Sequence, residues 1–206
     1  MYSVFPHFVL GFHGCDQSVA ERVLAGTDHH LSSSANGYDW LGHRIYFWEH
    51  NPQRALEYAH ELKENPKRTS KGKTVIENPV VVGAIIDHGT CLNLLEGKSI
   101  DIVRASYDHL STTTLSLNKE LPQNNSGRRY LDCAVIQAPH ELMEMQGKAY
   151  HSVRGAFIGG EPLYEGAEFK EKNHIQICVC NPNCIKGYFR PMMPVGGIPI
   201  PRAIGL

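Results

Sequence analysis

The feature that most constrains the fold is the apolar run Val80–Ile86, which lies between Pro79 and Asp87. A continuous run of this length, rich in β-branched residues, is typical of a strand buried on both faces. Such a strand needs neighbouring strands for its backbone and covering layers for its side chains. We therefore expect a layered fold built around this central strand.

Shorter patterns supply the remaining elements. Further strands are expected at Phe8–Gly14, Ile45–Trp48, Leu92–Leu95, Val153–Ile158, His174–Cys180 and Ile185–Phe189. Helices are expected at Val19–Leu24 after a cap at Asp16 or Ser18, from Pro52 through Gln53–Leu62, at Ser99–Leu110 and at Arg129–Ile136. Loops are expected at 27–38, 64–78, 111–128 and 159–173. Because strands and helices do not alternate strictly, the fold class is predicted to be α+β.

The length of 206 residues fits a single domain over 1–206. Within it, residues 190–206 carry four prolines and are expected to form a surface tail without regular structure. No stretch approaches 18 apolar residues, so no membrane span is expected. The N-terminal residues lack a signal-peptide pattern, which together with six cysteines favours a cytoplasmic protein with reduced thiols.

The formal net charge of −1 excludes nucleic-acid binding driven by a global positive field. A local basic face around Lys67, Arg68, Lys71 and Lys73 remains an alternative.

The cysteines raise the question of a metal site. Cys178, Cys180 and Cys184 are spaced as C-x-C-x3-C, which differs from the paired C-x2-C knuckles of zinc sites. Strand alternation places Cys178 and Cys180 on one face, so structural thiols and no metal are expected. A small zinc-bearing interaction protein is the open alternative. Cys15 follows Gly14 with no activating partner nearby, which argues against a nucleophile there.

Three features carry possible chemistry. His13-Gly14 ends an apolar strand, Tyr46-Phe47-Trp48 places three aromatic residues in a row, and a loop with several glutamates precedes the strand that holds Gln176. Each has a plain structural alternative, namely a hydrogen-bonded histidine, aromatic core residues and a polar strand edge. No feature is specific by itself.

Their order along the chain resembles that of ADP-ribosyltransferases, in the branch shared by poly(ADP-ribose) polymerases and diphtheria-type toxins. The resemblance lies in His13-Gly14, in Ile45-Tyr46-Phe47 followed by a helix with Tyr58, and in the late strand led by Gln176. It implies an ADP-ribosyltransferase-like fold with a split β-sheet core and flanking helices. It covers most of the chain in element order, while the specific motifs are short.

The resemblance also implies a site for NAD as substrate. His13 is expected to contact a ribose hydroxyl, and the Gly14 backbone to hold the nicotinamide carboxamide. Tyr46 and Tyr58 are expected to stack on the two faces of nicotinamide. Gln176 stands where the family usually has glutamate; it keeps a hydrogen bond but lacks the charge, a loss of about 1–3 kcal/mol.

The implied function is transfer of ADP-ribose from NAD to a protein or nucleic-acid acceptor, with release of nicotinamide. A toxin-like role with an inhibitory partner protein would suit such a chain. Glu165 or Glu168 in the preceding loop is expected to assist Gln176. Two alternatives stay open: an NAD glycohydrolase in which water is the acceptor, and a catalytically weak module that binds NAD or ADP-ribose.

Overall fold

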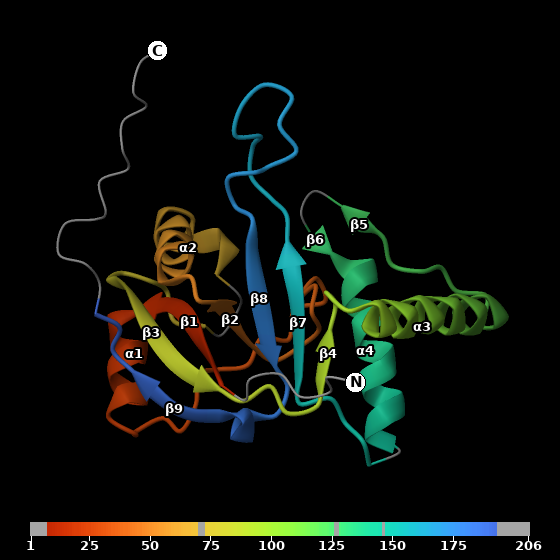
Figure 1. The fold of residues 1–206 in the computed structure, drawn as a ribbon, viewed down its shortest axis with the longest axis horizontal. Coiled ribbons are helices and arrows are strands. Elements are labelled where there is room, and N and C mark those ends of the chain that lie inside the picture. The colour runs from red at the N-terminus through yellow and green to blue at the C-terminus, as the bar shows by residue number, and fades with distance from the viewer. Residues whose placement is uncertain (1–7, 70–72, 126–127, 146, 193–206) are drawn as a thin grey trace.

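The computed structural model describes residues 8–69, 73–125, 128–145 and 147–192 (Figure 1). Its strands are β1 (Val9–Asp16), β2 (Ile45–Glu49), β3 (Pro79–Ile86), β4 (Cys91–Asn93), β5 (Asn124–Asn125), β6 (Arg128–Arg129), β7 (Ser152–Phe157), β8 (His174–Val179) and β9 (Ile185–Phe189). Its helices are α1 (Gln17–Leu24), α2 (Pro52–Glu64), α3 (Gly97–Ser116) and α4 (Tyr130–Met145), with short 3₁₀ turns η1 (Pro66–Arg68) and η2 (Pro182–Cys184). Most of the predicted tail, 193–206, lies outside the described residues.

A seven-stranded mixed sheet in the order β4-β7-β8-β2-β1-β3-β9 forms the centre of the molecule. The β4–β7 pair is parallel, and the other pairs are antiparallel. The predicted central strand is β3, which pairs with β1 along its whole length, from Val9–Ile86 to Asp16–Pro79. The predicted α+β class is confirmed, but β3 lies next to the edge strand β9, and β2 is the central strand of the sheet.

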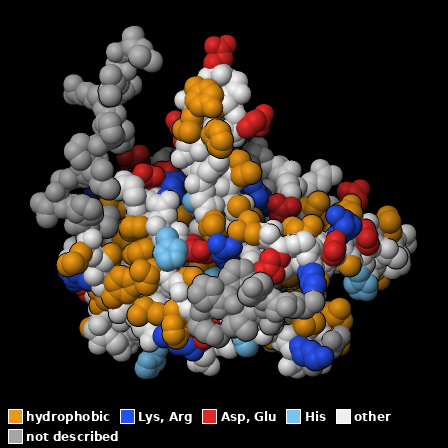
Figure 2. All heavy atoms as spheres, in the orientation of Figure 1, with side chains coloured by type: hydrophobic (Ala, Val, Ile, Leu, Met, Phe, Trp, Pro, Cys, Tyr) orange, Lys and Arg blue, Asp and Glu red, His pale blue; other side chains and the backbone are white. Residues whose placement is uncertain are grey.

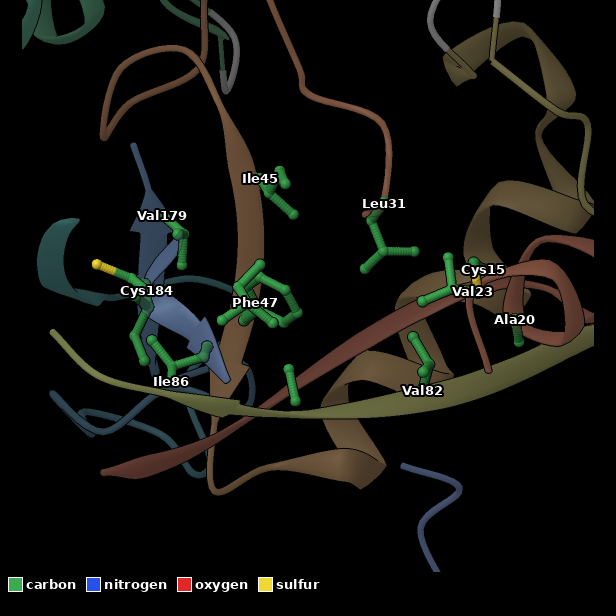
Figure 3. Close-up of a cluster of buried hydrophobic side chains, with 13 residues drawn as sticks. Cys15, Ala20, Val23, Leu31, Ile45, Phe47, Val82, Ile86, Val179 and Cys184 are labelled. Atoms are coloured by element: carbon green, nitrogen blue, oxygen red, sulfur yellow. The ribbon is translucent and has the colours of Figure 1, made fainter. Parts of the chain in front are cut away.

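One core lies on the face of the sheet that we call the inner face. It contains side chains of β2 and β8 as well as of β1 and β3. Figure 3 shows Ile45 and Phe47 of β2 in one buried cluster with Val82 and Ile86 of β3. Phe47, Val82 and Ile86 have no exposed surface. Burying such side chains contributes roughly 1.5–3 kcal/mol each, so this cluster ties the two parts of the sheet together.

Two helices cover different parts of the opposite face. α2 packs on β1 and β3 through a cluster that includes Phe12, Trp48 and Ala55. α4 packs on β7 and β8 through a cluster that includes Ile136 and Tyr46. β2 thus contributes Trp48 to one cluster and Tyr46 to the other, and its outer face lies between the two helices (Figure 1).

Several element boundaries differ from the predictions, and three of these differences bear on the site or on the length of a helix. β1 does not end at Gly14 but runs on to Asp16 and leads directly into α1. α3 continues to Ser116 through a segment predicted as loop, and hydroxyls there donate back to the helix, as from Thr112 to Asp108 O at 2.8 Å. α4 continues past Ile136 to Met145 and includes Pro139.

Asp16 joins these elements by capping α1 and holding the segment before β3. Its carboxylate accepts from Ser18 N, Glu77 N and Asn78 N, each at 2.9 Å, and from the Ser18 hydroxyl at 2.7 Å. Burial alone would raise the pKa of Asp16, but these hydrogen bonds outweigh it and hold the pKa well below its ordinary value. The N-cap predicted at Asp16 is confirmed.

Asp16→Asn is expected to lower the free energy of unfolding by about 1–3 kcal/mol at neutral pH, because the amide loses the charge-assisted bonds. Because folding lowers the pKa of Asp16, its carboxylate stabilises the fold at every pH above the pKa of the unfolded chain, about 4. This stabilisation is lost as the pH falls from that value toward the pKa of the folded chain. Urea unfolding across this pH range should show that the free energy of unfolding falls less steeply with acid in the variant than in the native chain. Asp28→Asn, which breaks an exposed pair with Arg22, is the control and should change little. Equal effects of both variants would contradict the role of Asp16.

Candidate functional site

The candidate site lies where β1 and β2 separate. Their ladder contains only the pairs Gly11–Glu49 and Phe12–Trp48, whereas β2 pairs with β8 from Ile45 to Trp48. Continuing the β1–β2 register would set Gly14 opposite Tyr46. Instead, His13 Nδ1 lies 2.7 Å from the carbonyl oxygen of Tyr46. A side chain therefore replaces the backbone at the point where the sheet splits.

His13 is neutral in this position. Burial lowers the pKa of the ring, the bond to Tyr46 O opposes this shift, and nearby Lys73 lowers the pKa further. A carbonyl only accepts, so Nδ1 carries the proton and donates to Tyr46 O. In the neutral ring Nε2 is then an acceptor. That is the form that accepts a hydrogen bond from a hydroxyl.

Gly14 is required by packing. A Cβ at this position would overlap the carbonyl group of Ala55 and lie 3.1 Å from Cβ of Ala59, both on α2. Its peptide group faces the gap between β1 and β2. Leu10 O accepts from His50 N at 2.9 Å, so the backbone of Leu10 faces β2. Alternate residues of a strand present their N–H and C=O to the same edge, and Gly14 is an even number of residues from Leu10. The backbone of Gly14 thus points toward β2 beyond the last ladder pair.

Tyr46 is anchored by its hydroxyl. The oxygen accepts from Leu41 N at 2.9 Å and donates to Gly42 O at 2.8 Å. Burial raises the pKa of Tyr46 well above its ordinary value, so the phenol stays protonated and can donate. The half-buried ring packs against the cluster under α4. Tyr46 therefore holds the 41–42 turn as well as presenting a ring on the outer face.

Gln176 lies on the same face of the sheet as Tyr46. In the β2–β8 register Tyr46 pairs with Cys178 and Trp48 pairs with Gln176, so these four side chains share one face. The Gln176 Oε1 atom accepts from Trp40 Nε1 at 2.6 Å. The carboxamide is thereby held in one orientation.

Tyr58 completes this face from α2. Its ring centroid lies 5.0 Å from that of Trp48. The structure brings Tyr46, Tyr58 and Gln176 to one face. The His13 ring instead contacts Phe47, on the inner face, and joins the others only through the Tyr46 carbonyl.

Sequence reasoning missed a further group of aromatic and basic side chains beside Gln176. Trp40 contacts Phe157 with ring centroids 5.8 Å apart, and Phe157 stacks on His174 at 5.0 Å. The guanidinium of Arg129 lies 5.0 Å from the rings of both Trp40 and Phe157. The one sequence signal was a tryptophan within an otherwise polar segment.

Three buried polar atoms near this group have no hydrogen-bond partner within the described chain: Trp48 Nε1, Arg54 Nε and His174 Nε2. The rings of Trp48 and His174 are 6.1 Å apart. Burial lowers the pKa of His174, its bond to Lys172 O opposes this, and Arg54 adds to the lowering. A buried polar group without a partner costs roughly 1–3 kcal/mol, so hydroxyl or amide groups of a ligand would be favoured here.

The predicted glutamates lie away from Gln176. The segment between β7 and β8 projects beyond both strands (Figure 1) and is held together by bonds such as Leu163 N to Phe169 O at 3.0 Å. Glu165 and Glu168 are exposed in its outer part. Figure 2 shows hydrophobic and acidic side chains together at the tip of this segment, and Leu163 and Phe169 are among its exposed hydrophobic residues. Neither glutamate is brought to Gln176 in this conformation.

The two alternative binding features were a local basic face and a metal site. Arg68 pairs with Glu61 at 3.4 Å, and Lys73 Nζ donates to Ser32 O and Ser33 O at 2.8 and 2.7 Å, so two members of the basic stretch serve internal contacts; Lys71 lies outside the described residues. Within the described chain no group of three or more His, Cys, Asp or Glu is placed to hold a metal ion.

The three thiols of the C-x-C-x3-C spacing do not come together at one place, because Cys184 lies apart from Cys178 and Cys180. Cys178 packs in the cluster under α4, whereas Cys184 packs in the inner core. Cys178 and Cys180 do contact the same cluster, as predicted. Burial, with Asp16 nearby, raises the pKa of the Cys15 thiol to about 12, so it is unsuited to act as a nucleophile.

A surface hollow of about 650 Å³ lies elsewhere, at the end of α4, and is lined by Thr90, Met143, Gly147, Lys148, Ala149 and His151. None of the predicted site residues lines it. No helix in the part of the chain that the structure describes combines the length and apolarity needed to cross a membrane. Comparison with protein-family models, curated proteins and solved structures finds no match to this chain.

Proposed function

We propose that this chain binds NAD and transfers ADP-ribose to a macromolecular acceptor, protein or nucleic acid, releasing nicotinamide. One observation carries the proposal: His13, Tyr46 and Gln176 lie on the adjacent strands β1, β2 and β8, and His13 bonds to the Tyr46 carbonyl where β1 and β2 separate. These strands bring residues up to 163 positions apart in the sequence close to one another, with the Tyr46 and Gln176 side chains on the outer face and the His13 ring on the inner face.

The chemistry of the bond explains why such residues would serve. Breaking the nicotinamide–ribose bond builds positive charge on the sugar, as in glycoside hydrolysis. Aromatic rings bind a cationic pyridinium without a competing charge, which suits Tyr46 and Tyr58. The acceptor nitrogen of neutral His13 and the carboxamide of Gln176 suit ribose hydroxyls. The Gly14 peptide group, directed into the split, suits a carboxamide.

A second candidate function is an NAD or ADP-ribose-binding module with little catalysis. The observation that favours it is Gln176 itself, which is neutral and whose oxygen is already engaged by Trp40 at 2.6 Å. A neutral group does not stabilise the cationic sugar as a carboxylate does. Binding would survive this substitution, while turnover would suffer.

The test is incubation of the purified protein with NAD, following free nicotinamide with and without cell lysate. Release that depends on lysate indicates transfer, and release without it indicates hydrolysis by water. Protection of the protein against heat by NAD, without release of nicotinamide, would select the binding module. If NAD gives no nicotinamide release and no protection against heat, both functions are contradicted.

Gln176→Glu is expected to raise nicotinamide release about 10- to 100-fold, because the carboxylate adds a charge opposite the developing cation. Trp40 Nε1 donates to Oε1, and a carboxylate oxygen accepts this bond equally well, so the substitution fits the site. Initial rates at saturating NAD provide the measurement.

Gln137→Glu is the matched control, because Gln137 is also a half-buried glutamine whose Oε1 accepts a hydrogen bond, from His43 N at 3.3 Å, but it lies on α4. Its rate should not rise. If Gln176→Glu folds normally, binds NAD and releases nicotinamide no faster than the native chain, the assignment of Gln176 to the reacting ribose is wrong.

A further inference from the structure

A thiol–imidazole pair lies at the end of β8, outside the candidate NAD site. Cys180 Sγ is 3.7 Å from Nε2 of His140, which projects from α4. The His140 ring is held in turn by an edge-on contact with Tyr150, with centroids 5.5 Å apart. A thiol within reach of an oriented imidazole is the arrangement that activates sulfur nucleophiles.

The surroundings distinguish Cys180 from the other cysteines. A hydrogen bond from the Cys178 thiol lowers the pKa of Cys180, burial opposes this, and the His140 contact and nearby Arg44 lower it further. Cys91 is half-buried like Cys180, yet burial raises the pKa of its thiol to about 11. The remaining four, Cys15, Cys133, Cys178 and Cys184, are buried, and burial raises the pKa of each.

The surface hollow lies next to the segment that carries this pair. His151 and Met143 line the surface hollow of about 650 Å³ at the end of α4. The carbonyl of His151 accepts from Cys180 N at 2.9 Å, and Met143 packs against the same cluster as Cys180. The hollow therefore adjoins the segment that carries the thiol.

We propose that Cys180 is a modification site, at which a thiolate held by His140 reacts with small electrophiles of the hydroperoxide class. The sulfur attacks one peroxide oxygen, so that an S–O bond forms while the O–O bond breaks. The departing oxygen takes a proton from solvent and leaves as water or an alcohol. The thiolate is oxidised by two electrons to a sulfenic acid, and the peroxide is reduced.

The experiment measures alkylation by iodoacetamide at each cysteine of the intact chain, by mass spectrometry, from about pH 5 to about pH 9. The rate at an ordinary thiol rises about tenfold per pH unit up to its pKa, because only the thiolate reacts. We expect the rate at Cys180 to level off below about pH 7, while the rate at Cys91 keeps rising. Hydrogen peroxide with dimedone should label Cys180 before any other cysteine.

His140→Phe keeps an aromatic ring against Tyr150 but removes the nitrogen. It should lower the rate at Cys180 about tenfold or more near pH 6 and move its plateau upward. His109→Phe, at an exposed position of α3, is the matched control and should change nothing. A pH profile at Cys180 of the native chain that rises in parallel with Cys91 overturns the proposal, whether or not the variants fold.

Discussion

Gly14→Ala is expected to lower the free energy of unfolding by about 3 kcal/mol or more, a large part of the roughly 5–15 kcal/mol of an ordinary domain. The added Cβ would overlap the carbonyl group of Ala55. That group belongs to the backbone of α2 and cannot rotate away. Relief requires α2 to move off β1, which would open the cluster of Phe12 and Trp48. Urea unfolding followed by circular dichroism measures the loss.

Gly187→Ala is the matched control, because Gly187 also lies in a strand, β9, and an added Cβ there meets nothing within 4 Å. Its stability should be unchanged or slightly higher, since alanine restricts the unfolded chain. Equal stability of the two variants would show that α2 does not sit as close to β1 as described. Because Gly14 has this packing role, loss of NAD binding in Gly14→Ala would not by itself show that its backbone binds nicotinamide.

Gly14 also shows which part of the fold could be predicted from the sequence. A glycine after an apolar run predicts a strand end, but here it lies within β1 because a helix from residues 52–64 presses on it. Such close approaches depend on residues far away in the chain. The run Val80–Ile86 was predicted correctly as a strand because its signal is local: it is a continuous apolar run in which five of seven residues are β-branched.

The candidate site divides in the same way. The presence of Tyr46 on a strand, Tyr58 on a helix and Gln176 on a late strand followed from local patterns. The engagement of Gln176 by Trp40 did not, because these residues are 136 positions apart and Trp40 lies in no regular element. The remote position of Glu165 and Glu168 was also beyond prediction, since it depends on how the segment between β7 and β8 projects (Figure 1).

Tyr46→Ala is expected to lower the free energy of unfolding by about 3–5 kcal/mol and to abolish NAD binding. If Tyr46 served only to stack on nicotinamide, binding would be lost while the fold stayed stable. The structure adds two hydroxyl bonds, to Leu41 N and Gly42 O, and packing against the cluster under α4, so the stability should fall too. Thermal unfolding with and without NAD would record both changes but would not separate them.

Two further substitutions separate the roles of the hydroxyl and the ring. Tyr46→Phe and Tyr46→Leu both remove the hydroxyl, so each should lose about 1–3 kcal/mol of stability from the unpaired Leu41 N and Gly42 O. Only Tyr46→Leu also removes the aromatic face. If the ring stacks on nicotinamide, calorimetric titration should show NAD affinity kept by Tyr46→Phe and reduced about tenfold or more by Tyr46→Leu. Equal affinities in two folded variants would instead assign Tyr46 to the 41–42 turn alone and move the stacking role to Tyr58 or Trp48.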